Sequence, residues 1–176
     1  MILKKVTISD RNQWERLLLS YFLLLMIYRI YSSAMLVYAH GQPIRTPDLD
    51  YTFWLSHLIG FPDMIIQHYW LCFLIDVGVI GCSVFALFNK RKRTAWVAAL
   101  LVLFFLQRIT LESFSASHTK SIVCIFVALF PLCFKSEVRF GLMQEAARYF
   151  LLYILLFSAW NKWANGALLT AGNFVN

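Results

Sequence analysis

Charged side chains interrupt two apolar stretches of this sequence that are long enough to cross a lipid bilayer. Arg29 lies inside the run Leu17–Tyr38. Asp76 lies inside the run Tyr69–Phe88. A bilayer core of roughly 30 Å needs about 20 apolar residues of helix to span it, and a charge within such a helix is costly unless it has a partner or a function. The pattern indicates an integral membrane protein with a polar interior.

Arg29 and Asp76 lie at similar depths within their apolar runs, so we expect the two side chains to lie close together. Because a helix rises about 1.5 Å per residue, two antiparallel spans would bring Arg29 and Asp76 to one level, and we predict a salt bridge between them. Arg108 and Glu112 are four residues apart and therefore share a helix face. A polar cavity in this half of the bundle would suit an amphipathic small molecule such as a quinone or a lipid headgroup. Structural explanations stay open: Arg29 and Asp76 can tie two helices together, and Arg108 and Glu112 can solvate each other.

Two further residues on the same side are candidates for acid–base chemistry. Lys162 stands between Trp160 and Trp163, and His118 follows the third apolar run. A lysine desolvated by aromatic neighbours can accept a proton. The same arrangement is also typical of an interfacial anchor whose amine reaches the headgroups. A histidine at a helix exit is more often a hydrogen-bonded loop residue than a base.

The composition excludes several other classes of protein. Of the 176 residues 60% are hydrophobic and only 14% are charged, well below the roughly 25% charged residues of soluble domains. The net charge of +7 comes from Lys and Arg clustered beside the apolar runs, which indicates anionic lipid headgroups and not nucleic acid. The cysteines lie in apolar segments without the spacing of a zinc site, so we expect free thiols and no metal. They are Cys72, Cys82, Cys124 and Cys133.

We expect an all-α fold, a polytopic transmembrane helix bundle in which residues 1–176 form one transmembrane domain. About five spans are expected, at approximately 17–38, 69–88, 94–114, 121–134 and 146–160. The apolar stretch Tyr51–Phe61 is too short to span, so a short interfacial segment is expected after the first helix. The Lys and Arg of the short loops place the N-terminus in the cytoplasm and the C-terminus outside, with the bacterial inner membrane as the expected location.

Three segments occur in an order that resembles a known family. They are Ile27–Ile30 with its arginine, Ala116–Lys120 with its histidine, and Arg148–Gly166 with its lysine, tryptophan and glycine. The chain in this respect resembles the HTTM family, the membrane domain of vitamin K-dependent gamma-carboxylase-like proteins, akin to DoxX-like membrane proteins. The resemblance implies that Lys162 takes a proton from a quinol and that His118 contributes to the same site. The stretch between the lysine and the glycine is shorter than in the carboxylase, and the length excludes a complete carboxylase.

Three functions follow as hypotheses. The leading one is a small HTTM/DoxX-like membrane subunit or binding module that holds a quinone or lipid in an outward-facing cavity lined by Arg29, Asp76, Arg108 and Glu112. The alternative is a quinol-linked membrane enzyme that uses the lysine and the histidine. The third is a purely structural subunit of a larger complex, whose partners are the lipid bilayer and other membrane or periplasmic subunits.

Overall fold

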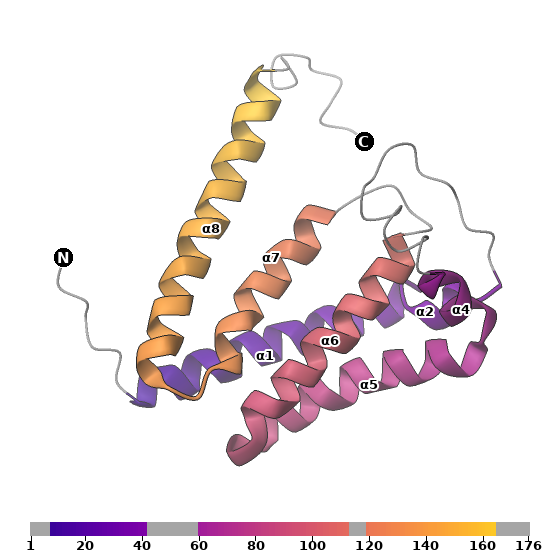
Figure 1. Cartoon of the computed structure of the whole chain (residues 1–176), viewed down its shortest axis with the longest axis horizontal. Coiled ribbons are helices and arrows are strands. Elements are labelled where there is room, and N and C mark those ends of the chain that lie inside the picture. The colour runs from indigo at the N-terminus through magenta and orange to yellow at the C-terminus, as the bar shows by residue number, and fades with distance from the viewer. Residues whose placement is uncertain (1–7, 42–59, 113–118, 165–176) are drawn as a thin grey trace.

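The computed structural model describes residues 8–41, 60–112 and 119–164, and these residues are all-α (Figure 1). The expected helical class is therefore confirmed for this part of the chain. The elements, in chain order, are α1 (Ile8–Tyr31), α2 (Leu36–Ala39), α4 (Phe61–Gln67), α5 (Tyr69–Phe88), the 3-10 helix η1 (Lys90–Lys92), α6 (Arg93–Glu112), α7 (Thr119–Leu129), the 3-10 helix η2 (Phe130–Cys133) and α8 (Glu137–Ala164).

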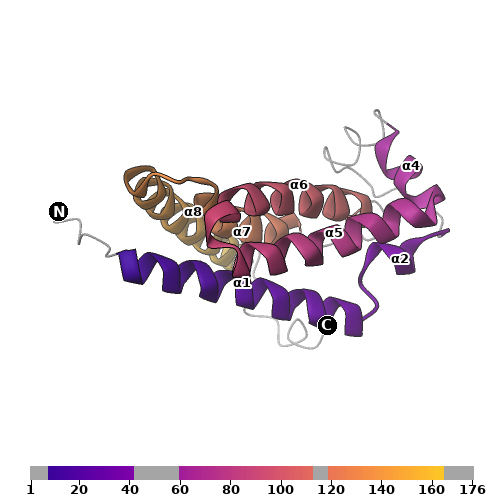
Figure 2. The same cartoon turned by 90° about the horizontal axis from the view of Figure 1, so that it is seen from below.

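Three long helices pack together at the centre of the molecule, with α1 on one side of the hairpin of α5 and α6 (Figure 2). α5 and α6 form a hairpin across η1, and α1 runs antiparallel along α5 (Figures 1 and 2). The core between them is apolar, and Phe22 of α1 meets Phe104 of α6 edge to face at 5.2 Å between ring centroids. Gly78 lets α5 approach α6 closely, because a Cβ built there would lie 2.8 Å from Cδ1 of Leu103. The core thus holds α1, α5 and α6 as one packed unit.

The first apolar run is not one continuous helix. α1 ends at Tyr31, Ser33 adopts a positive φ of 54°, and α2 follows after a short turn. The backbone N–H of Ala34 donates to the carbonyl of Arg29 at 2.8 Å within this turn. At its other end α1 already begins at Ile8, nine residues before the expected start at residue 17. The turn redirects the chain so that α2 lies against α5 and α6.

Four of the described helical segments are long and apolar enough to cross a membrane, and they lie at Arg11–Ala39, Tyr69–Phe88, Lys90–Leu111 and Glu137–Trp160. The predicted fourth span, 121–134, is instead the 11-residue α7 followed by η2, which contains Pro131. Proline cannot supply a backbone donor to continue the α-helix. The count of five spans therefore stays a prediction. The expected interfacial stretch 51–61 lies almost wholly outside the described residues.

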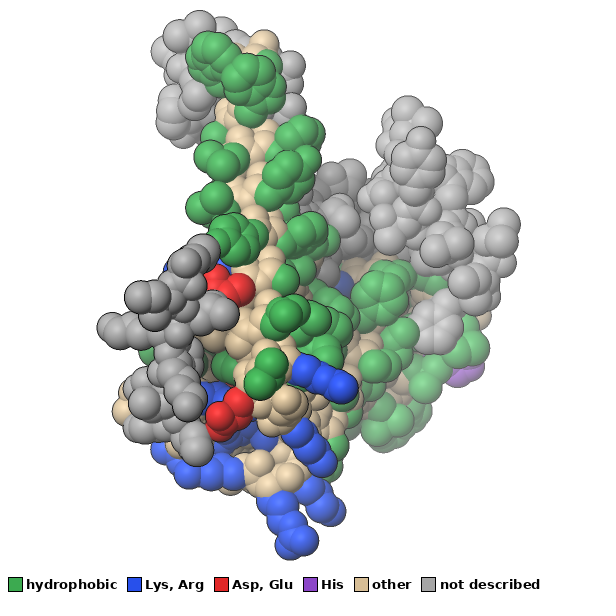
Figure 3. Space-filling model, turned by 60° about the vertical axis from the view of Figure 1, so that its left-hand side comes forward, with side chains coloured by type: hydrophobic (Ala, Val, Ile, Leu, Met, Phe, Trp, Pro, Cys, Tyr) green, Lys and Arg blue, Asp and Glu red, His purple; other side chains and the backbone are tan. Residues whose placement is uncertain are grey.

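α8 stands apart from the rest of the molecule. It begins beside α7 and η2, where Phe140 is buried in the core, and then rises away from α6 (Figure 1). Only 11% of its apolar window is buried, and hydrophobic side chains cover it along its length (Figure 3). α8 starts at Glu137, nine residues before the expected residue 146. Such a helix needs lipid or another protein around it, because exposed apolar surface on this scale is unfavourable in water.

Candidate functional site

Asp76 lies at the centre of a buried polar contact between three helices. Its side chain is on α5 and is 4% exposed. Oδ2 accepts a hydrogen bond from the backbone N–H of Val37 in α2 at 3.0 Å, and Oδ1 accepts one from Nε2 of Gln107 in α6 at 2.7 Å. A buried carboxylate with two such donors is stabilised without a cation in direct contact. This contact holds α2 against the hairpin of α5 and α6.

The predicted salt bridge between Arg29 and Asp76 is wrong. Arg29 instead donates from Nε and Nη2 to the carbonyl of Ala34, at 3.2 and 2.5 Å, while the carboxylate takes the two donors described above. The cause is the turn after α1, which brings this carbonyl within reach of the guanidinium. The two charged groups stay close enough to interact electrostatically, and Arg108 also acts on Arg29. Arg29, Asp76 and Arg108 thus lie close enough to interact electrostatically, while the predicted cavity that they would line stays a prediction.

Gln107 is a polar residue of this region that the reasoning from the sequence missed. It is fully buried, and its Nε2 also lies 3.9 Å from Sδ of Met35. Its Oε1 has no hydrogen-bond partner among the described residues. A buried acceptor without a partner lowers the stability of a protein by about 1–3 kcal/mol, so a hydrogen-bond donor placed at this oxygen would be stabilising. The signal was present in the sequence, because the residue is an uncharged amide at the end of the apolar run 94–106.

The remaining candidate residues lie partly or wholly outside the described residues. Glu112 is the last residue of α6, and its side chain lies outside the described part of the chain. His118 lies outside the described segments. Lys162 is on the last turn of α8, at the end that stands away from α6 in Figure 1, and its side chain is also outside the described part. The roles of these three residues stay predictions.

The cysteines are free, and they lie on α5, α7 and η2. Sγ of Cys72 donates to the carbonyl of Ile65 at 3.2 Å, which ties α5 to α4. Among the described residues no group of three His, Cys, Asp or Glu side chains is placed to hold a metal ion. In the buried region Arg29, Asp76, Gln107 and Arg108 can make hydrogen bonds and charge interactions, and we call these four residues the polar cluster.

Comparisons with known proteins do not assign a family. No family model, curated protein or solved structure matches this chain. The part of the chain that the structure describes is helical, and four of its helices are long and apolar enough to suit a lipid bilayer. The resemblance to the HTTM family stays an expectation from the sequence.

Proposed function

We propose that this protein is a small membrane subunit that binds an amphipathic molecule, a quinone or a lipid headgroup, at the polar cluster. The observation that carries the proposal is the buried Oε1 of Gln107, which has no partner among the described residues. A bound hydroxyl group would supply the missing donor. Reduced quinones and many lipid headgroups carry such hydroxyls, and the HTTM resemblance makes a quinol the first ligand to test.

The charge of the polar cluster supports the same class of ligand. Its described side chains include two guanidinium groups, Arg29 and Arg108, and one carboxylate, Asp76. An excess of positive charge in a region of low dielectric favours carbonyl or phosphate oxygens as binding partners. Tyr28 and Tyr31, on the last turn of α1, are 65% and 88% exposed. They offer an aromatic surface on which the apolar part of such a molecule can lie.

A second function, helix assembly without a ligand, is favoured by the partners of Asp76. The carboxylate joins α2 to α5 and α6 through two hydrogen bonds, which is the arrangement of a structural tie. In that case the cluster would stabilise the bundle for assembly with other membrane subunits. The quinol-linked enzyme of the sequence resemblance depends on Lys162 and His118, so it stays a prediction.

Ligand extraction from the purified protein tests the proposal. The chain is purified in a mild nonionic detergent, and the bound quinones and lipids are extracted and quantified by mass spectrometry. We expect Gln107→Met, which keeps the side-chain length but removes the amide, to lower the retained ligand markedly. Gln144→Met on α8 is the matched control, because it makes the same change on a half-buried residue outside the polar cluster.

The outcomes separate the two functions. Equal retention of ligand by the wild type and both variants would refute binding at the polar cluster. Absence of any extracted quinone or lipid, together with strong destabilisation by Asp76→Ala, would support the structural tie instead. Selective loss in Gln107→Met alone would support the binding function.

A further inference from the structure

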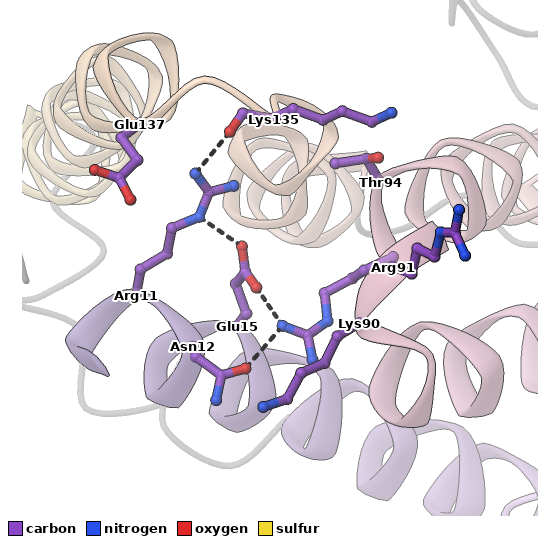
Figure 4. A pocket seen from close by; sticks show the side chains of 9 residues that line it. Arg11, Asn12, Glu15, Lys90, Arg91, Thr94, Lys135 and Glu137 are labelled. Carbon is purple, nitrogen blue, oxygen red and sulfur yellow. Dashed lines mark hydrogen bonds and ion pairs between the residues drawn. The ribbon is translucent and has the colours of Figure 1, made fainter. Parts of the chain in front are cut away.

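A second polar site lies at the opposite end of the bundle, where basic side chains gather. Figure 3 shows Lys and Arg grouped below the free-standing α8. A pocket of about 490 Å³ opens there between the start of α1, η1, the start of α6 and the turn from η2 into α8 (Figure 4). Pockets that take small ligands have volumes of roughly 300–1,000 Å³. The pocket is thus large enough for a small polar group.

A network of fixed charges forms one wall of the pocket. Glu15 of α1 is paired with Arg11, from Nε to Oε1 at 2.8 Å, and through Oε2 with Nη1 of Arg93. Arg93 also donates to Oδ1 of Asn12 at 3.1 Å and to the carbonyl of Ala86 at 2.9 Å. The side chains of the two arginines and the glutamate are only 6–15% exposed. Their charges are therefore held in place before any ligand arrives.

Arg11 extends this network to the turn that begins α8. Its Nη1 and Nη2 donate to the carbonyls of Lys135 and Phe134, at 3.1 and 2.7 Å. Its guanidinium also lies 4.3 Å from the ring centroid of Phe140. These contacts position the turn at Lys135 near η1, so that cationic residues from segments far apart in the sequence line one pocket (Figure 4).

The remaining lining residues leave an excess of positive charge. The pocket is lined by five cationic and two acidic side chains, an excess of three positive charges. Glu15 is already shared by two arginines. The side chains of Lys90, Arg91 and Lys135 are exposed and make no hydrogen bond or ion pair within the described part of the chain. Three cations with free donors around one pocket are suited to the oxygens of a phosphate group.

The surroundings of the pocket indicate where that phosphate comes from. The four long apolar helices begin or end at this level, so the pocket lies where a bilayer would present its headgroups. Large apolar side chains stand exposed on α1, α5 and α8 at the same end: Trp14 is 50% exposed, Phe88 77% and Val138 79%. An acyl chain can lie on this apolar surface while the headgroup enters the pocket.

We propose that this basic pocket binds the phosphate of an anionic phospholipid headgroup, between Lys90 and Arg91 on one side and Lys135 on the other. Arg11 and Arg93 form the wall and hold the turn, and they are positioning residues. Basic residues near an anionic surface are attracted to it even without a pocket. A specific site must therefore contribute more to the affinity for the lipid than the same number of basic residues placed elsewhere at this end of the bundle.

The test compares two triple variants of the full chain that remove equal charge. The pocket variant carries Lys90→Gln, Arg91→Gln and Lys135→Gln. The control variant carries Arg16→Gln, Lys92→Gln and Arg139→Gln, which are exposed basic residues of the same end that do not line the pocket. The detergent-purified proteins are titrated with phosphatidylglycerol dispersed in the same detergent, with phosphatidylcholine as the neutral reference lipid, and separately with inorganic phosphate.

We expect the wild type and the control variant to bind phosphatidylglycerol with similar affinity, and the pocket variant to bind it about tenfold or more weakly. Thermal melts of all three proteins check that the fold is kept, because neither set changes Arg11, Glu15 or Arg93. Equal loss in both variants would mean general surface attraction and would overturn the site. Binding of inorganic phosphate as tight as binding of the lipid would overturn the lipid as its source.

Discussion

Removal of the Glu15 charge is predicted to destabilise this protein far more than removal of an exposed glutamate. Glu15 is 7% exposed and pairs with both Arg11 and Arg93. Loss of one partner from a buried ion pair costs about 3–5 kcal/mol, because the remaining charge is left uncompensated. Glu15→Gln keeps an oxygen that can accept one hydrogen bond, and Arg93 keeps the carbonyl of Ala86. We therefore expect Glu15→Gln to lower the free energy of unfolding by about 3 kcal/mol, the lower end of that range.

The matched control is Glu145→Gln on α8. Glu145 pairs with Arg148 at 3.0 Å, but the two side chains are 36% and 72% exposed, and exposed pairs contribute about 0–1 kcal/mol. For a protein of this size 1 kcal/mol shifts the midpoint of thermal unfolding by about 2–4 °C. Glu15→Gln should therefore lower the melting temperature by roughly 6–12 °C, and Glu145→Gln by less than about 4 °C. Tryptophan fluorescence of the protein in nonionic detergent measures both.

A double-mutant cycle isolates the pair itself. Arg93→Met removes the charge of the partner but keeps a long side chain, and the combined variant with Glu15→Gln should be less unstable than the sum of the two single variants by about 1–3 kcal/mol. Additive effects, or a Glu15→Gln shift no larger than that of Glu145→Gln, would refute the reasoning. The ion pairs of Glu15 with Arg11 and Arg93 would then not hold α1 to α6.

Three further predictions concern packing, the polar cluster and topology. Gly81→Ala should raise the free energy of unfolding by about 0.5–1 kcal/mol, and with it the melting temperature, because nothing lies within 4 Å of a Cβ built at this position. Gly78→Ala should not stabilise the protein, because a Cβ there would lie 2.8 Å from the side chain of Leu103 on α6. Asp76→Ala should cost about 1–3 kcal/mol in thermal unfolding, since two buried donors lose their acceptor, and Asp76→Asn should cost less. In a background without the native cysteines, cysteines at Ser9 and Asn173 should be labelled from opposite sides of the membrane in intact cells, and labelling from one side would contradict an odd number of spans.

The sequence by itself determined the helical class of the described residues and the approximate place of the long helices, but not the bounds of α1 and α8. Apolar length is a local property, so the run Tyr69–Phe88 could be read directly and is the helix α5. The basic clusters could be read in the same way, because they depend only on which residues flank an apolar run. The break after α1 was missed, since the apolar run continues through it and only the backbone conformation at Ser33 shows the turn.

The partners of the charged residues were decided only by the tertiary structure. Equal depth placed Arg29 near Asp76, but depth does not decide which donor reaches an acceptor first. The guanidinium of Arg29 donates to a backbone carbonyl five residues further along the chain. The carboxylate of Asp76 accepts a hydrogen bond from the side-chain amide of Gln107 on α6. Likewise Glu15 and Arg93 are 78 residues apart in sequence, and they meet because α1 packs against the hairpin of α5 and α6. Residue types show what can bind, but the choice between competing partners depends on contacts of a few ångströms that only the packed helices define.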